Sequence, residues 1–289
     1  RETRQPEPES VPYAARYSNS RIKPISLDGL NPMQREAAEH VDGPLLVVAG
    51  AGSGKTRVLT HRIAHLISNH GVSPMNVLAI TFTNKAAGEM KHRVESLIGP
   101  VAKSMWVSTF HSACVRILRV HAERIGYPKT FSIYDQADAQ RLTGYVIRDM
   151  GLDVKRFTPR AVHAVISNWK NELVSPTQAA ERAAHIFDRK HSEIYREYQE
   201  RLLKAGAMDF DDLLVNVVRL FRMHTDVLAS YQDRFKYILV DEYQDTNIAQ
   251  NEIVLSLAAR HHNVCVVGDT DQSIYAFRGA DFRNIGQFE

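Results

Sequence analysis

The segment from Gly43 to Thr60, GPLLVVAGAGSGKTRVLT, constrains the fold more than any other part of the chain. An apolar run enters a loop of small residues, the loop ends in Gly-Lys-Thr, and a helix-compatible stretch follows, so the segment predicts a strand, a loop and a helix. Successive backbone N–H groups in such a loop, together with the helix N-terminus, can surround a phosphate. The segment therefore predicts a nucleoside triphosphate site built into an α/β sheet.

One position of this loop departs from the strict pattern G-x-x-x-x-G-K-[ST], because Ala49 stands where the first glycine is expected. Ala49 falls at the end of the predicted strand, where ordinary β dihedrals suffice. Lys55 would contact the β- and γ-phosphates, and the Thr56 hydroxyl would be a ligand of Mg²⁺. A glycine-rich turn without a ligand is the competing interpretation, but strand, loop, Gly-Lys-Thr and helix together favour nucleotide binding. The residues predicted to contact the nucleotide here are Ala49, Gly50, Ala51, Gly52, Ser53, Gly54, Lys55, Thr56 and Arg57.

A second acidic strand is expected to accompany a phosphate loop, and YILVDEYQDT supplies one. Asp241 at its end would hold Mg²⁺ through the water shell of the ion. Glu242 would orient and deprotonate the attacking water, which indicates hydrolysis rather than phosphoryl transfer to a substrate. Lys55 and Asp241 are 186 positions apart, more than a compact α/β domain needs.

Five short apolar runs predict the parallel strands of a doubly wound α/β sheet, because strands covered on both faces are almost continuously apolar. They are Leu45–Ala49, Val77–Phe82, Met105–Ser108, Tyr237–Val240 and Val264–Val267. Residues 116–208 are mostly helix-periodic, with one short strand expected in TFSIYD. We therefore expect a disordered tail at 1–26, an α/β domain at 27–115 that resumes at 209–289, and an inserted helical domain at 116–208.

Composition and charge exclude several classes of protein. The 289 residues contain two cysteines and no run of eighteen apolar residues, so neither a disulfide framework nor a transmembrane helix is expected. The N-terminal stretch lacks the apolar segment of a secretory signal, and two cysteines in apolar surroundings suit a reducing cytoplasm. Residues 116–208 carry a net charge of +5 and the remainder −2. This bias indicates either an anionic partner or a solvated helical surface.

Seven motifs in order resemble the superfamily 1 DNA helicases of the UvrD/PcrA/Rep type, over the N-terminal half of such proteins. They are LNPMQREAAEH, AGAGSGKT with its alanine, TFTNKAAGEM, STFHS, MDFDDLL, VDEYQDTN and VGDTDQSIYAFRGA. The resemblance runs from Leu27 to Glu289. It implies a RecA-like P-loop ATPase domain, interrupted by the helical insertion, with single-stranded DNA crossing its surface.

The resemblance also implies roles for individual residues. Gln34 would read the adenine edge, and Gln272 would sense the γ-phosphate and act with Lys55 and Glu242 in catalysis. The predicted DNA-binding residues are Phe82, Asn84, Thr109, His111, Tyr275, Phe277 and Arg278. The aromatic members would stack on bases, an interaction worth about 1–3 kcal/mol per base whatever the sequence. Core packing is the alternative for each aromatic, and Phe277 stands where the family commonly has tryptophan, which predicts weaker DNA contact.

The function that follows is ATP-driven movement along single-stranded DNA, 3′ to 5′ by resemblance, with duplex unwinding in repair or replication. The expected partners are ATP, Mg²⁺, single-stranded and duplex-junction DNA, and DNA repair proteins. Helicases of this family use arginines from a second RecA-like domain, and no motif in these residues matches them. We therefore expect the isolated chain to hydrolyse ATP slowly and not to unwind DNA.

Two other functions compete with the helicase. An ATP-binding regulatory or scaffolding module would need no nucleic acid, but QSIYAFRGA beside the γ-phosphate sensor favours DNA. A helicase–nuclease subunit is disfavoured by the short insertion and by the lack of a nuclease carboxylate cluster. His61 and His65 are four residues apart, yet no third ligand is evident, so no metal site is expected from them. Ala87 in TNKAA stands where a guanine-reading motif requires aspartate, which disfavours GTP.

Overall fold

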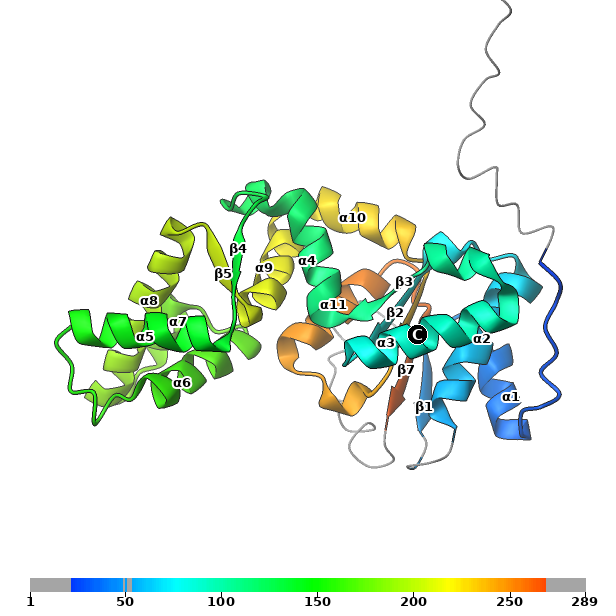
Figure 1. Ribbon diagram of the computed structural model, residues 1–289, viewed down its shortest axis with the longest axis horizontal. Coiled ribbons are helices and arrows are strands. Elements are labelled where there is room, and N and C mark those ends of the chain that lie inside the picture. The colour runs from blue at the N-terminus through cyan, green and yellow to red at the C-terminus, as the bar shows by residue number, and fades with distance from the viewer. Residues whose placement is uncertain (1–21, 49, 51–53, 269–289) are drawn as a thin grey trace, which may run out of the picture.

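The computed structural model describes residues 22–48, 50 and 54–268. One half contains a parallel sheet with helices on both faces, and the other half is a group of helices beside it (Figure 1). Among the described residues, no helix combines the length and the apolar character needed to cross a bilayer.

The elements of the sheet half come from both ends of the chain. In order they are α1 (Pro32–Glu39), β1 (Leu45–Val48), α2 (Lys55–His70), η3 (Pro74–Asn76), β2 (Val77–Thr81), α3 (Asn84–Ile98), η4 (Pro100–Ser104), β3 (Trp106–Thr109), α4 (Phe110–His121), η5 (Ala122–Ile125), α9 (Phe210–Met223), α10 (Thr225–Arg234), β6 (Tyr237–Val240), η6 (Tyr243–Asp245), α11 (Ile248–Ala258) and β7 (Val264–Gly268). The other half consists of β4 (Ser132–Tyr134), α5 (Gln136–Asp149), α6 (Pro159–Asn171), α7 (Pro176–Arg182), α8 (Ile186–Lys204) and β5 (Ala207–Asp209).

The large sheet has five strands in the order β1-β7-β6-β2-β3, and every neighbouring pair is parallel. The five predicted strands and their parallel arrangement are therefore confirmed, with ends that shift by about one residue; Ala49 lies outside the described residues. The register pairs Val48 with Gly268 and Thr81 with Thr109. As a result, the carboxyl ends of all five strands lie at one edge of the sheet, where ligands bind in open α/β sheets.

The two faces of this sheet are covered by different helices, and the alternation of side chains along each strand decides which residue faces which helix. Val77 and Ala79 pack with α2 and α3, in a cluster that includes Leu59, Ile63, Met90 and Val94. Leu78 and Ile80 face the other way and pack with α4, α9 and α11. Both faces are apolar, which explains why the strands read as continuous apolar runs.

The helical half has a hydrophobic cluster of its own, formed by α5, α6 and α8 with Ala179 of α7 and Ala207 of β5. The short strand expected in TFSIYD is confirmed as β4, whereas its parallel partner β5 was not expected. Residues from Ile117 to Phe131, at the start of the predicted insertion, pack in the cluster of the sheet half instead.

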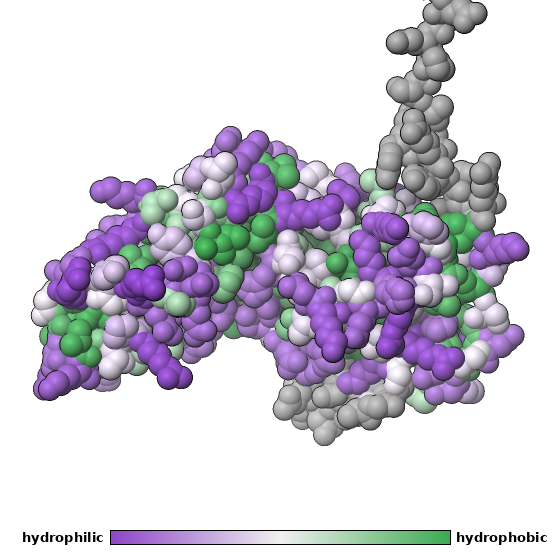
Figure 2. All heavy atoms as spheres, in the orientation of Figure 1, coloured by the Kyte–Doolittle hydropathy of each residue, from purple (hydrophilic) through white to green (hydrophobic). Residues whose placement is uncertain are grey.

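Most basic side chains of the helical half lie at the surface. Of the Lys and Arg residues between 116 and 208, a stretch that is described throughout, Lys170 alone is buried. Hydrophilic side chains cover most of both halves in the view of Figure 2, and apolar side chains show as separate patches. The basic charge of this stretch is therefore available to solvent.

The last part of the predicted tail is held by α2. Ile25 donates its N–H to the Asn69 side chain at 3.0 Å, and Ile22 packs against the α2–α3 side of the sheet. Residues 22–26 thus belong to the folded part, while residues 1–21 lie outside the described residues.

Candidate nucleotide and nucleic-acid site

Gly54 forms the junction between the predicted phosphate loop and α2. It is the N-cap of α2 and has φ 78° and ψ 30°, a left-handed conformation that favours glycine. A Cβ added there would lie 2.9 Å from Nε2 of Gln34. The expected helix start is confirmed, because α2 begins at Lys55. Glycine is favoured at this position by its left-handed backbone conformation, whereas the Gln34 side chain could move away from a Cβ.

The segment before α1 is held against this junction by two side chains. Gln34 closes a capping box, since its N–H donates to Asn31 Oδ1 at 2.8 Å and its Oε1 accepts from the Asn31 N–H at 3.0 Å. Arg57 donates from Nη2 to the Gly29 carbonyl at 2.8 Å. The residue expected to read adenine therefore lies directly over the start of α2, and Arg57 joins the two segments.

Asp241 and Glu242 follow β6 at the same edge of the sheet. The Asp241 N–H donates to the Ile80 carbonyl at 3.0 Å, and Asp241 Oδ1 accepts from the Glu242 N–H at 2.9 Å. Burial raises the pKa of Asp241, while the hydrogen bond from Glu242 and the positive charge of Lys55 lower it. The structure thus brings Lys55 into electrostatic range of Asp241, across the 186 positions that separate them.

The backbone at Glu242 is strained, with φ 50° and ψ 43°. Left-handed backbone at a non-glycine residue costs about 1–3 kcal/mol and clusters at functional sites, although Leu173 and His262 adopt it here as well. Gln244 Nε2 donates to Glu242 Oε2 at 2.5 Å and fixes the direction of the carboxylate. This geometry orients a carboxylate beside Asp241 at the strand end.

Two predicted DNA-binding residues follow β2. The Phe82 ring is half-buried and lies edge-on to Phe110, with 5.7 Å between the ring centroids. Asn84 is exposed at the first position of α3, after the N-cap Thr83. The contact with Phe110 shows that one edge of Phe82 packs in the protein, which is the alternative to base stacking. Asn84 faces solvent.

Two more follow β3, the neighbouring strand. Thr109 is the N-cap of α4; its Oγ1 accepts the Ser112 N–H at 3.1 Å. The half-buried His111 ring lies edge-on to Phe210, with centroids 6.2 Å apart. Burial lowers the pKa of His111, which favours the neutral imidazole. Phe210 is 46% exposed, so an aromatic ring stands at the surface beside His111.

Residues 30–289 match the family described as UvrD/REP helicase, N-terminal domain. The chain belongs to this family. It is 54% identical over 263 residues to the ATP-dependent DNA helicase PcrA of Bacillus subtilis, and 52% identical to PcrA of Staphylococcus aureus strain Mu50. It is also 54% identical over 274 residues to the ATP-dependent DNA helicase UvrD1 of Mycobacterium bovis. Each alignment covers 91% of this chain and 36% of the relative, so the chain spans about a third of their length.

Several predicted site residues, four from the phosphate-loop pattern and four from the family resemblance, fall in segments that the structure does not describe. Ala49, Ala51, Gly52, Ser53, Gln272, Tyr275, Phe277 and Arg278 lie outside the described residues. Gly50 is described and exposed, and Thr56 is half-buried at the second position of α2. The chain enters residues 269–289 at the end of β7, where Gly268 pairs with Val48 at the entry to the phosphate loop.

A buried ionic network in the MDFDDLL motif was missed by the sequence reasoning. Lys170 Nζ lies 2.8 Å from Asp209 Oδ2 and 2.9 Å from Asp212 Oδ1. Tyr198 donates its hydroxyl to Asp209 Oδ2 at 2.7 Å. The spacing of Asp209 and Asp212, three residues apart, is typical of a capping box, and it forms one at the start of α9. Nothing in the sequence around Lys170 indicates burial of its ammonium group.

Proposed function

We propose that the chain binds ATP and single-stranded DNA, as the N-terminal part of an ATP-dependent DNA helicase. The observation that carries the proposal is the convergence at one sheet edge of Lys55 and Asp241 with Phe82, Thr109 and His111. Because the nucleotide site and the DNA surface lie on neighbouring strand ends, binding or hydrolysis of ATP can alter the affinity for DNA. The relatives named ATP-dependent DNA helicases support the same activity.

The described residues fit ATP with Mg²⁺. The left-handed Gly54 and the N-terminus of α2 form a cradle for phosphate oxygens, and Lys55 projects from the first helical position. Thr56 and Asp241 offer a hydroxyl and a carboxylate, the oxygen ligands suited to Mg²⁺. The ion supplies charge neutralisation to the phosphates when bound. Glu242, held by Gln244, accepts a proton from the attacking water, and Gln34 contacts adenine.

The DNA surface in this proposal extends from the described residues to the segment after β7. Phe82, Tyr275 and Phe277 stack on bases, while Asn84, Thr109 and His111 contact phosphates. Gln272 and Arg278 communicate between the γ-phosphate and the DNA. In this proposal the protein moves 3′ to 5′ and acts on duplex junctions in repair or replication. It works with DNA repair proteins and is located in the cytoplasm.

The proposed domain organisation keeps a RecA-like ATPase domain at 27–115 and 209–289, with an insertion at 116–208. The separate hydrophobic cluster of α5, α6 and α8 supports an independent helical unit. The isolated chain is proposed to hydrolyse ATP slowly, because arginines supplied by another domain contribute about 10³ to 10⁵ to such rates.

Binding of a fluorescent ATP analogue tests the nucleotide site. Lys55→Ala is expected to weaken binding roughly 10- to 100-fold, since a charge-assisted hydrogen bond contributes about 1.5–3 kcal/mol. Lys103→Ala is the matched control, because this lysine is 68% exposed in η4, before β3 and away from the carboxyl edge of the sheet. Equal affinity of the wild type and Lys55→Ala would contradict the proposal. Nucleotide binding without any affinity for DNA would favour a regulatory module instead.

A further inference from the structure

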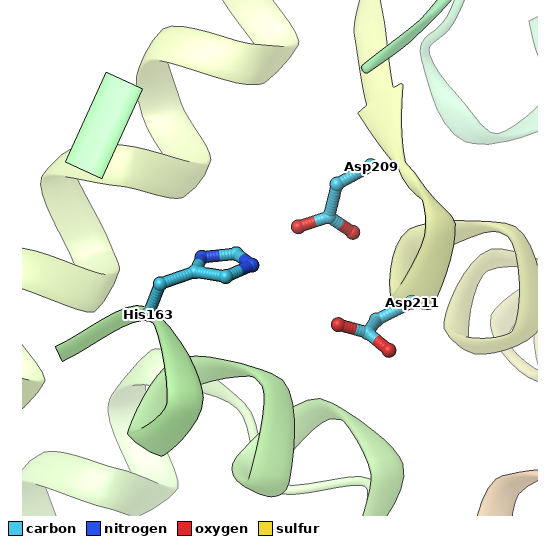
Figure 3. A group of neighbouring side chains, drawn as sticks. All are labelled: His163, Asp209 and Asp211. Carbon is cyan, nitrogen blue, oxygen red and sulfur yellow. The ribbon is translucent and has the colours of Figure 1, made fainter. Parts of the chain in front are cut away.

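A cavity of about 430 Å³ lies where α5 and α6 meet the junction of β5 and α9. Three side chains that can bind a metal line it: His163 from α6, Asp209 from the end of β5, and Asp211 from the first turn of α9 (Figure 3). One ligand atom from each lies within 4.8 Å of the others. We propose that His163, Asp209 and Asp211 bind one divalent transition-metal ion, with Zn²⁺ as the best match to one imidazole and two carboxylates.

The hydrogen bond of His163 uses Nδ1, so Nε2 is the ring nitrogen available to a metal. Thr143 has one hydroxyl proton, and it donates this to the Ala139 carbonyl at 2.9 Å. The contact of 3.3 Å between His163 Nδ1 and Thr143 Oγ1 must then have the imidazole as donor. In the neutral ring this assignment puts the proton on Nδ1 and the lone pair on Nε2. A second hydrogen bond of this kind sets the tautomer of metal-binding histidines.

The Nε2 atom of His163 is directed at the two carboxylates, as Figure 3 shows. The side chain is 7% exposed, and among the described residues Nε2 has no hydrogen-bond partner. A deprotonated nitrogen facing carboxylate oxygens is unfavourable unless a proton or a metal cation lies between them. Ligands bound at about 2.1 Å in a tetrahedral site are about 3.4 Å apart, so groups at the 4.8 Å limit would close by somewhat more than about 1 Å when the ion binds.

Asp209 has room for one more interaction. A carboxylate has about four acceptor positions. Lys170 and Tyr198 use two on Oδ2, and the Asp212 N–H uses one on Oδ1 at 2.8 Å. One position on Oδ1 remains. Asp211 is half-buried and accepts a hydrogen bond from Ser167, which leaves its other positions for an ion.

The charge balance of the network also favours a cation. Asp209, Asp211 and Asp212 bring three carboxylates together, and Lys170 supplies one positive charge within bonding distance of two of them. Arg160, the one Lys or Arg among the described residues that line the cavity, is exposed. A divalent ion would neutralise the two carboxylates that Lys170 leaves uncompensated. It would also connect α6 to the residues flanking Phe210, whose ring contacts His111.

Metal binding by the nucleotide-free chain tests the proposal. Mn²⁺ is the spectroscopic probe: its free electron paramagnetic resonance signal should fall with one site per chain, and Zn²⁺ should displace it. Asp211→Asn, which keeps the shape of the side chain, and His163→Gln should each weaken binding at least about tenfold. Saturating Zn²⁺ should raise the wild-type Tm by about 5 °C and leave Asp211→Asn unchanged.

Two further variants exclude other sites. His70→Gln alters a histidine whose Nε2 lies 3.0 Å from Nε2 of His65, outside the proposed site, and this variant should bind the metal as the wild type does. Loss of binding in Asp241→Asn would place the ion at the nucleotide site and overturn the proposal. Equal affinity of the wild type and Asp211→Asn, both folded by circular dichroism, would overturn it as well, as would the absence of binding at millimolar metal. If His163→Gln does not fold, Asp211→Asn decides the outcome.

Discussion

Replacing Lys170 by methionine should destabilise the protein strongly, because it removes the cation from a buried network of carboxylates. The side chains of Lys170, Asp209 and Asp212 are 1%, 3% and 2% exposed. Methionine keeps the length and apolar stem of lysine, so the packing of α6 is largely preserved. The substitution therefore measures the charge rather than a cavity.

The expected loss of stability depends on the carboxylates that stay buried after Lys170 is replaced. Removing one partner of a buried ion pair costs about 3–5 kcal/mol, because the other charge stays buried without compensation. For a protein of this size that corresponds to a fall in Tm of at least about 6 °C. The exposed pair of Lys190 and Glu193, on the neighbouring α8, offers a matched control. Lys190→Met should cost less than about 1 kcal/mol.

The cost should depend on pH in a defined direction. Burial alone would raise the pKa of Asp209, but the charge and hydrogen bond of Lys170 hold it below its ordinary value. Burial and the charge of Asp209 raise the pKa of Asp212 to about 6. Without Lys170 both folded-state pKa values lie above the unfolded values. The folded variant then binds more protons than the unfolded chain, and its stability falls as pH rises from about 4 through those raised values.

Urea unfolding of Lys170→Met and the wild type at about pH 5 and about pH 8 measures this effect. The free energy of unfolding should differ more at the higher pH. Lys190→Met should show no such difference. A cost below about 1 kcal/mol at both pH values, or an equal cost at both, would refute the assignment of a charged buried network.

Three smaller predictions follow from the same structure. Gly54→Ala should raise the dissociation constant for nucleotide about tenfold in a binding titration, because holding an L-residue in the left-handed conformation at the end of the phosphate loop costs about 1–2 kcal/mol. Burial raises the pKa of Cys265 to about 11 and that of Cys114 further, so a thiol reagent at about pH 8 should label neither in the native protein and both after unfolding. His111→Ala should weaken oligo-dT binding in fluorescence anisotropy about two- to tenfold, the size of one hydrogen bond.

The large sheet could be predicted from the sequence because its burial is uniform. Strands such as Val77–Thr81, buried at every position, produce unbroken apolar runs that no exposed strand would show. The strand Ala207–Asp209 was missed for the opposite reason. It has three residues and ends in an acidic capping residue, so neither periodicity nor composition marks it.

In the candidate site, too, some features could be predicted from the sequence and others could not. Backbone requirements leave a sequence signal, as at Gly54, where the left-handed dihedral angles favour glycine. Interactions between distant segments leave none. Lys170 lies in a helix whose pattern suits a solvated lysine, and its partners follow 39 or more residues later. The left-handed backbone of Glu242 and the tautomer of His163 likewise follow from packing that the sequence does not display.

If the chain binds ATP and single-stranded DNA at neighbouring strand ends, nucleotide binding should change its affinity for DNA. Anisotropy of labelled oligo-dT should be measured with and without a non-hydrolysable ATP analogue and Mg²⁺, for the wild type, Lys55→Ala and Tyr275→Ala. We expect salt-sensitive DNA binding that the analogue shifts in the wild type but not in Lys55→Ala, and we expect Tyr275→Ala to weaken DNA binding. DNA affinity that is identical with and without the analogue in the wild type, although the analogue binds, would contradict the proposal.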